Sequence, residues 1–279
     1  MTAMLPGTDR VAGPTGSFLR SVVRQVCTTA LVLGVVVLLW TVALRVWDVS
    51  PYVGKTPAEV WTTLFGDDDS AELRTEVWAL LQQTLTDAAV GFAAGMLTAI
   101  VLAAVVVRYK LLEGAVMPVA VVLQTVPLIA LAPILILLVG RGYAVVATMS
   151  AIVVLFPALV NIVAGLRSVT PQMLDLVLVY GGSPTTVLLT VGFPSALPAL
   201  FASVRIAVPG SLTGALLAEW LATGKGIGYA VVSAANRSQN ARVWALVVAI
   251  TLTALLRYLV AQLLETAVLR RFGRPAASR

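Results

Sequence analysis

Residues 175–198 read DLVLVYGGSPTTVLLTVGFPSALP, and this stretch decides how the chain is organised. An apolar run is interrupted at Gly181-Gly182-Ser183-Pro184, resumes, and then meets Pro194 and Pro198. Glycine in a helix has a high entropic cost, and proline removes a backbone donor and clashes with the preceding turn. The stretch therefore predicts two short helices with a sharp corner between them, the second of which stops at Pro194 and Pro198. Two membrane spans need no such corner, whereas a docking surface does.

The composition is that of an integral membrane protein. Of 279 residues, 59% are hydrophobic and 11% are charged, whereas soluble domains have about 45–50% apolar and about 25% charged residues. The chain has no histidine, so the commonest general base and zinc ligand are missing. The single cysteine, Cys27, excludes an internal disulfide. The net charge is +6, but no basic stripe with interleaved aromatic residues indicates nucleic-acid binding.

Six apolar runs are long enough to cross a bilayer, which takes about 20 helical residues. The first is too long for the apolar core of a signal peptide, about 7–15 residues. We therefore expect an all-α integral membrane protein with about six transmembrane helices, in the runs 26–46, 84–107, 113–139, 144–166, 196–221 and 243–269.

These runs divide the chain into segments. We expect a polar tail at 1–24, a first transmembrane helix at 25–47, an extracytoplasmic loop at 48–78, a membrane core at 79–271 with the loop 167–194 between its fourth and fifth spans, and a tail at 272–279. Within 48–78, Thr56-Pro57-Ala58-Glu59 predicts the start of a helix. The acidic run 67–69 is a candidate metal or diphosphate site, but a solvated loop is the favoured interpretation, since no second acidic cluster completes a site.

Basic residues predict the orientation. Six spans place both termini on one side, which then carries ten Lys and Arg residues against seven on the other. Since cytoplasmic loops are enriched in these residues, both termini and the loop 167–194 are expected in the cytoplasm.

The spacing of this loop resembles the E-A-A-x3-G-x9-I-x-L-P pattern of the permease subunits of bacterial ABC importers. Asp175 stands at the acidic position, Leu176 and Val177 at the two alanines and Gly181 at the glycine, while Val191, Phe193 and Pro194 complete the pattern. The residue types depart at the acidic position and at both alanines. Pro198 and the segment 204–207 are similar to the nitrate, sulfonate and taurine branch, and so are the segments 117–118, 127–133, 140–142, 156–157, 218–219 and 226–229.

The resemblance implies a function and a set of partners. The chain would form the translocation path of an importer in the plasma (inner) membrane, for a small polar solute such as a sulfonate, taurine, nitrate, bicarbonate or a pyrimidine vitamin precursor. Two cytoplasmic ATP-binding subunits, a second and commonly identical permease copy and an extracytoplasmic solute-binding protein would complete it, with no cofactor or metal in this chain. The residues expected to couple the permease to the ATPase are Asp175, Leu176, Val177, Tyr180, Gly181, Gly182, Ser183, Pro184 and Pro194.

Polar groups inside the apolar runs are candidates for the solute path. Gln124, Thr125 and Asn161 would line the path or form hydrogen bonds between helices, and Pro127 and Pro133 must kink their span. Charges at membrane depth are costly. Of these, Glu219 is a candidate gate or path residue or an interfacial one, Arg205 is expected to pair or to face water, and Arg257 is expected to be structural.

Two other classes of function compete with this interpretation. A secondary transporter would need a relay of carboxylates and an internal repeat, and neither is evident. An intramembrane enzyme would need catalytic groups that the chain lacks. Gly224-Lys225 is similar to the end of a phosphate-binding loop, but Glu219 stands where the pattern requires its first glycine. No ATPase activity is therefore expected of this chain alone.

Overall fold

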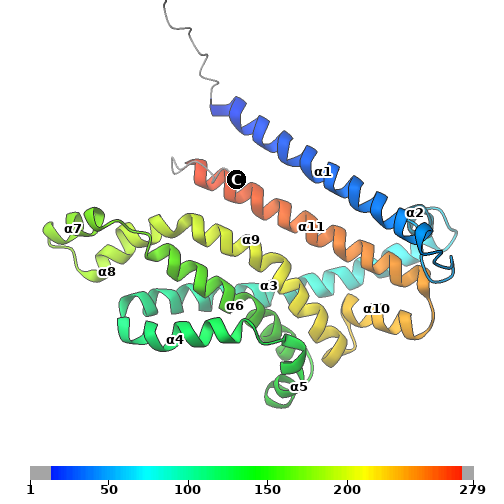
Figure 1. Ribbon diagram of the computed structural model, residues 1–279. Coiled ribbons are helices and arrows are strands. Elements are labelled where there is room, and N and C mark those ends of the chain that lie inside the picture. Colours follow the sequence, from blue (N-terminus) through cyan, green and yellow to red (C-terminus); the bar gives the residue numbers. More distant parts are fainter. Residues whose placement is uncertain (1–13, 272–279) are drawn as a thin grey trace, which may run out of the picture. The chain divides into compact units, whose positions relative to one another are not determined.

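The computed structural model describes residues 14–271, and these residues form helices and no strand (Figure 1). They fall into two compact units that meet at Glu59 and Val60. The all-helical prediction is confirmed. Residues 1–13 of the expected tail at 1–24, and the whole expected tail at 272–279, lie outside the described residues.

The first unit holds α1 (Pro14–Val46) and the beginning of α2 (Pro57–Phe65). α1 begins at Pro14, so its helix includes part of the segment expected as a polar tail, and its apolar part covers Val23–Val46. The helix start predicted at Thr56 is confirmed. The backbone N–H and the hydroxyl of Thr56 donate to the Glu59 carboxylate at 2.7 and 2.8 Å, and the Glu59 N–H donates to the Thr56 hydroxyl at 3.3 Å. This is a reciprocal capping box.

The second unit contains the long apolar helices. They are arranged so that α6 runs between α3 and α9, with α11 packed against α9. The elements in chain order are α3 (Ser70–Arg108), α4 (Lys110–Leu123), α5 (Leu128–Val139), α6 (Tyr143–Leu166), α7 (Pro171–Val179), α8 (Pro184–Val187), the π-helical turn η1 (Leu188–Gly192), α9 (Phe193–Ala218), the π-helical turn η2 (Glu219–Thr223), α10 (Gly226–Asn236) and α11 (Asn240–Arg271).

Glycines let the three central helices approach closely. A Cβ added to Gly91 of α3 would lie 2.1 Å from the Ser150 Cβ of α6. A Cβ added to Gly95 would lie 2.6 Å from the Ala151 carbonyl oxygen of the same helix. A Cβ added to Gly214 of α9 would lie 2.7 Å from the Ser150 Cα. Small residues allow such contacts between helices in lipid, where packing rather than water exclusion holds them together. α6 is thus held by glycines on both sides.

The buried side chains form two clusters along α3, α6 and α9. One cluster includes Val146, Met149 and Ile227 and receives Ala132 from α5. The other includes Leu159, Ile162 and Val106 and receives Ala120 from α4. α4 and α5 therefore cover different stretches of the same three-helix core.

Within residues 14–271, five helices, or six if α4 and α5 count as one span, are long and apolar enough to cross a membrane. The run 113–139 is not one straight helix, because α4 and α5 are bent by 110° at the break between Leu123 and Leu128. At 1.5 Å per residue, α4 and α5 are about 21 and 18 Å long, each short of the roughly 30 Å hydrocarbon core. Pro127 precedes α5 with an extended backbone, so the kink predicted there is confirmed.

The expected stop at Pro194 and Pro198 is wrong. Pro194 stands in the first turn of α9, and Pro198 lies inside it. α8, η1 and α9 follow one another without a break, and 184–223 counts as one candidate span. A membrane helix tolerates proline because neighbouring helices and local π-helical adjustments satisfy the freed backbone groups. The second short helix is therefore the first turn of a much longer helical run.

Within the second unit, α7 and α8 lie at one end, as does the C-terminal end of α11, and α10 lies at the other end (Figure 1). The two ends carry the two candidate sites.

Candidate functional site

The first candidate site is the surface of α7 and α8, called here the α7–α8 surface. Neither helix contains a buried residue. Large apolar side chains are nevertheless exposed on it, most of all Val179 (83%) and Tyr180 (84%), with Met173, Leu176 and Leu178. Exposed apolar side chains grouped in this way indicate an interaction surface.

The corner between α7 and α8 is built by two glycines. Gly181 has a φ of +79°, a left-handed conformation that side chains other than glycine rarely adopt. Its N–H donates to the Leu178 carbonyl at 2.9 Å, and the Gly182 N–H donates to the Val177 carbonyl at 2.9 Å. This pair of bonds is the Schellman motif that ends a helix. A Cβ on Gly182 would lie 2.5 Å from a Val177 methyl carbon, so both glycines are required.

The start of α8 is fixed just after this corner. The Thr186 N–H donates to the Ser183 hydroxyl at 3.2 Å, and Pro184 stands in the first turn, as in a well-formed helix start. Because α8 continues through η1 into α9, the exposed corner is joined by continuous helix to the buried core.

The structure brings the predicted residues of this loop together as follows. Asp175, Leu176, Tyr180, Gly181, Ser183 and Pro184 are exposed; Val177 and Gly182 are half-buried at the corner; and Pro194 lies apart from them, half-buried at the start of α9. Asp175 forms no ion pair within residues 14–271, which leaves its charge available to a partner.

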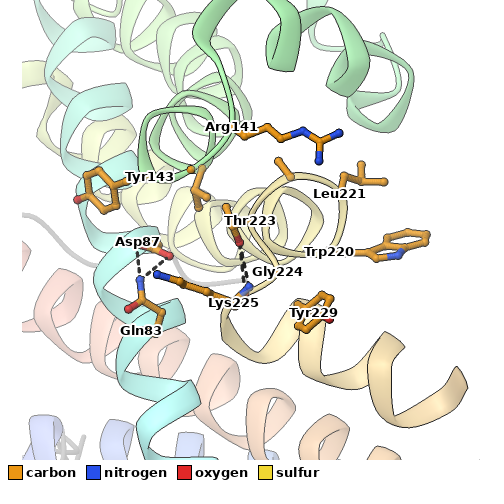
Figure 2. A pocket seen from close by; sticks show the side chains of 13 residues that line it. Gln83, Asp87, Arg141, Tyr143, Trp220, Leu221, Thr223, Gly224, Lys225 and Tyr229 are labelled. Atoms are coloured by element: carbon orange, nitrogen blue, oxygen red, sulfur yellow. Dashed lines mark hydrogen bonds between the residues drawn. The ribbon is translucent and has the colours of Figure 1, made fainter. Parts of the chain in front are cut away.

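The second candidate site is a cavity of about 670 Å³ at the other end of the unit (Figure 2), called here the outer pocket because the basic residues of the sequence predict this end to be extracytoplasmic. Its walls come from α3, from the connection between α5 and α6, from η2 and from the start of α10. The lining residues are Gln83, Asp87, Arg141, Gly142, Tyr143, Val146, Trp220, Leu221, Ala222, Thr223, Gly224, Lys225 and Tyr229.

The outer pocket combines charges of both signs. The Asp87 side chain is only 3% exposed, and both of its oxygens accept hydrogen bonds from the Gln83 amide, at 3.0 and 3.1 Å. In Figure 2 the side chain of Lys225 extends toward Asp87 and Gln83. Arg141 and Lys225 are exposed and form no ion pair in the described part of the chain.

Glu219 lies beneath the wall that η2 and α10 give to this pocket. It is 0% exposed, and its Oε2 accepts a hydrogen bond from the Gly228 N–H at 2.9 Å. The Ile227 N–H donates to the buried Thr84 hydroxyl at 3.0 Å. A carboxylate is favourable at a helix N-terminus, where free N–H groups and the helix dipole meet. Thr84 thus holds the first turn of α10 against α3, and Glu219 holds it against η2.

The five residues predicted for the solute path are not gathered at one place. Gln124, Thr125 and Pro127 are exposed at the break between α4 and α5, Asn161 is half-buried on α6, and Glu219 is buried at η2. None of them lines the outer pocket. Sequence reasoning missed Asp87, although a carboxylate inside the apolar run 84–107 was a signal for it.

Ion pairs connect the helices outside both candidate sites. Arg205 of α9 and Glu265 of α11 pair at 3.2 Å, so Arg205 is paired, one of the two outcomes expected for it. Arg167 pairs with Glu113, and Arg242 pairs with Glu76. One guanidinium nitrogen of Arg257 is buried without a hydrogen-bond partner in the described residues.

Comparison with known proteins places most of the second unit in one family. The family model "Binding-protein-dependent transport system inner membrane component" matches residues 91–274. A Haemophilus influenzae protein named "Probable ABC transporter permease protein" is 32% identical over 75% of this chain and 83% of its own length. A formylaminopyrimidine transport permease of Halalkalibacterium halodurans is 30% identical over 66% and 74%. A nitrate import permease of Synechocystis is 28% identical over 56% of each chain.

Proposed function

The chain belongs to the family of binding-protein-dependent inner membrane components of ABC importers, and from this premise we propose that its α7–α8 surface docks the subunit that hydrolyses ATP. The chain itself is a multi-pass inner membrane permease component, and ATPase activity resides on a separate subunit. The observation that carries the proposal is an exposed apolar surface joined by unbroken helix to the membrane core.

The chemistry of the surface suits such a partner. The exposed side chains of Leu176, Val179 and Tyr180 can enter an apolar groove, and Asp175 can pair with a basic group at its rim. Apolar and aromatic anchors supply most of the energy of an interface, while charges at the rim orient the partners. Pro194 marks the point where this surface passes into α9.

Movement of the docked subunit would reach the solute path through α9. The helical run from α8 to α9 packs on α6, and α6 packs on α3 with glycine contacts on both sides. Tightly packed helices shift as bodies because close-packed interiors do not deform continuously. ATP-driven closure of two ATPase subunits would therefore swing these spans, and hydrolysis would reset them.

The path itself is for a small polar solute, which the similarity to sulfonate, nitrate and pyrimidine-precursor permeases supports. Two permease copies, each with the residues Gln124, Thr125, Pro127, Asn161 and Glu219, would enclose it, and an extracytoplasmic binding protein would deliver the solute. Gln124 and Thr125 are exposed in one copy, so a second copy can cover them.

The orientation of the chain in the membrane follows from its membership of this family. The α7–α8 surface must face the cytoplasm, where ATP is, and this agrees with the excess of basic residues on that side. Both termini would then be cytoplasmic, and the outer pocket would open toward the binding protein.

The test is co-purification of the tagged full chain with the ATPase subunit in mild detergent. Asp175→Lys and Gly181→Leu should each abolish or strongly reduce co-elution, because one reverses the rim charge and the other cannot adopt the left-handed backbone. Asp68→Lys and Gly140→Leu are the matched controls, since Asp68 is exposed and Gly140 has a φ of +86° with no atom near its Cβ position.

Retention of the ATPase by both α7–α8 variants would contradict the proposal. Elution of the unmodified chain without any ATPase, together with uptake in energised vesicles depleted of ATP, would favour an ion-coupled secondary transporter instead.

A further inference from the structure

We propose that the outer pocket is a solute-binding site for a zwitterion, a molecule whose N–H donor group binds Asp87 while its anionic group binds Arg141 and Lys225. The inference rests on the proposed function, because it places a solute at the extracytoplasmic end of the permease. It names a binding site and the kind of solute charge that the site accepts.

The Asp87 carboxylate is buried and forms no ion pair in the described residues. A carboxylate that is 3% exposed in a membrane helix has a large cost unless it is paired, and such residues face the interior of the bundle and mark solute or ion pathways. Its side-chain partner, Gln83, is a neutral amide, and Asp87 forms no ion pair within residues 14–271. Lys225 extends toward Asp87 (Figure 2) but forms no ion pair with it in the described residues, so a cationic group of the solute would supply the missing counter-charge.

Two cationic side chains, Arg141 and Lys225, line the same pocket. Arg141 lies between Gly140 and Gly142, whose φ angles are +86° and +110°, so the loop that carries it can turn sharply. Lys225 follows Gly224, whose φ is +68°. Both cations are exposed and unpaired in the described chain, in contrast to Arg167, Arg205 and Arg242. They can therefore accept an anionic group without breaking an existing ion pair.

The volume of the outer pocket also suits a small organic solute. A volume of about 670 Å³ falls in the range of about 300–1,000 Å³ that is usual for small-molecule sites. Tyr143, Trp220 and Tyr229 add aromatic surface to the walls. A nitrate ion would leave most of this space empty, whereas an organic solute with two separated polar groups can contact polar side chains on more than one wall.

The charges of the outer pocket also discriminate between solutes. A solute that is only anionic would be attracted by Arg141 and Lys225 but repelled by Asp87. A solute that is only cationic would meet the opposite balance. Discrimination by a built-in repulsive group is a common way to achieve specificity. Asp87 is therefore the specificity-determining residue of the pocket.

The wall beneath the pocket is preorganised for this role. The hydrogen bonds that Glu219 and Thr84 accept from the first turn of α10 fix the position of this turn. Lys225 and Tyr229 lie on either side of it. Binding groups held by a rigid second layer lose less entropy when a ligand binds.

The experiment measures equilibrium binding to the full chain in complex with its ATPase subunits in lipid nanodiscs. The probes are radiolabelled 4-aminobutyrate and butyrate, which differ in the ammonium group. We expect 4-aminobutyrate to bind at least about tenfold more tightly than butyrate, since a charge-assisted hydrogen bond distinguishes them. In Asp87→Asn the two affinities should differ by no more than about twofold, while the control Asp68→Asn keeps the full preference.

Equal affinities in the unmodified protein, binding of neither probe, or an unchanged preference in Asp87→Asn would each overturn the inference. A zwitterionic lipid headgroup has the same chemistry as the proposed solute, so the measurement is repeated with and without phosphatidylethanolamine in the nanodisc. Loss of 4-aminobutyrate binding in the presence of that lipid would assign the pocket to a headgroup. Since co-elution of the ATPase is measured separately, this inference can fail while the proposed function stands.

Discussion

At the scale of single residues, the α10 end of the second unit depends on two glycines that have no side chain. Gly226 has a φ of +80°, and a Cβ there would lie 2.2 Å from the carboxyl group of Glu219. Gly228 is similarly confined, since its Cβ would lie 2.2 Å from the Leu216 carbonyl oxygen. The buried carboxylate and the two glycines therefore form one arrangement, in which each part requires the others.

Gly226→Ala should destabilise the protein. The left-handed backbone alone costs an alanine about 1–2 kcal/mol, a fall in melting temperature of roughly 2–8 °C, and the contact with Glu219 adds to it. The measurement is thermal unfolding in detergent. Gly114→Ala is the control, because no atom lies near its Cβ position, and it should melt at or above the temperature of the unmodified protein. An unchanged melting temperature in Gly226→Ala would disprove the arrangement.

The capping box of α2 gives a prediction about pH. Hydrogen bonds from the Thr56 backbone and hydroxyl hold the pKa of Glu59 below its ordinary value. A carboxyl group whose pKa is lowered by folding stabilises the fold above its unfolded pKa, about 4.3, and this contribution is lost as the pH falls through the folded pKa. Hydrogen-exchange protection at residues 58–60 should therefore decrease below about pH 4.

The control for this prediction is Glu59→Gln, in which the protection of the same amides should be lower at neutral pH and should not change with acidification. Exchange is corrected for its intrinsic dependence on pH and compared with α6. If the unmodified protein keeps full protection at pH 3, the carboxylate does not hold this helix start.

Residue patterns predicted local features better than their surroundings. Thr56, Pro57 and Glu59 indicated a helix start because all of the groups involved lie within four residues. Glu219 was singled out as a charge at membrane depth, but its partner, Gly228, depends on a fold around Gly224. The pocket that contains Asp87 joins four distant segments, which no local pattern can bring together.

At the scale of elements, α6 is the helix on which the others are organised. Gly91 and Gly95 of α3 contact one side of it, and Gly214 of α9 contacts the same turn around Ser150. Small residues spaced four apart, such as Gly91 and Gly95, allow helices to approach closely in lipid, and these three contacts are of that kind. The identity of the facing helix was not predictable, because the spacing marks a surface and not its partner.

Gly214→Leu should disrupt the packing of α9 on α6, because the Cβ position is already 2.7 Å from a backbone carbon and neither helix can move without breaking the core. We expect little folded protein in a size-exclusion profile after mild solubilisation. Gly34→Leu on α1 is the control, since no atom lies within 4 Å of its Cβ position. Equal yields of monodisperse protein from both variants would contradict the packing argument.

The helices with prolines were predicted least well. Pro127 does interrupt its apolar run, whereas Pro198 does not interrupt α9. The difference lies in the surroundings: 124–127 forms an open break, while Pro198 follows a π-helical turn inside a long apolar run. Proline alone therefore marks a weak point in a membrane helix and does not decide whether the helix bends.

At the scale of the whole molecule, the two sites lie at opposite ends of the second unit, with the α7–α8 surface at one end and the outer pocket at the other (Figure 1). An importer subunit needs one end for the energy source and one for the solute. Composition and the lengths of the apolar runs predicted an all-α integral membrane protein with about six spans, because hydrophobicity is additive along the chain.

This arrangement predicts which residues face which compartment. In a chain freed of its native thiol by Cys27→Ser, Asp68→Cys should react with a membrane-impermeant maleimide in intact cells. Tyr180→Cys, at a position that is also exposed, should react only after the membrane is permeabilised. Labelling of Tyr180→Cys in intact cells would place the α7–α8 surface outside and reverse the proposed orientation.

The most direct test of the central claim is a cross-link from the α7–α8 surface to the ATPase. A cysteine-directed bifunctional reagent is applied to membranes that contain the permease, its ATPase subunit and either Cys27→Ser/Tyr180→Cys or Cys27→Ser/Asp68→Cys. We expect a permease–ATPase adduct from position 180 and none from position 68. No adduct from position 180, or equal yields from both positions, would contradict the claim that this surface couples the permease to ATP hydrolysis.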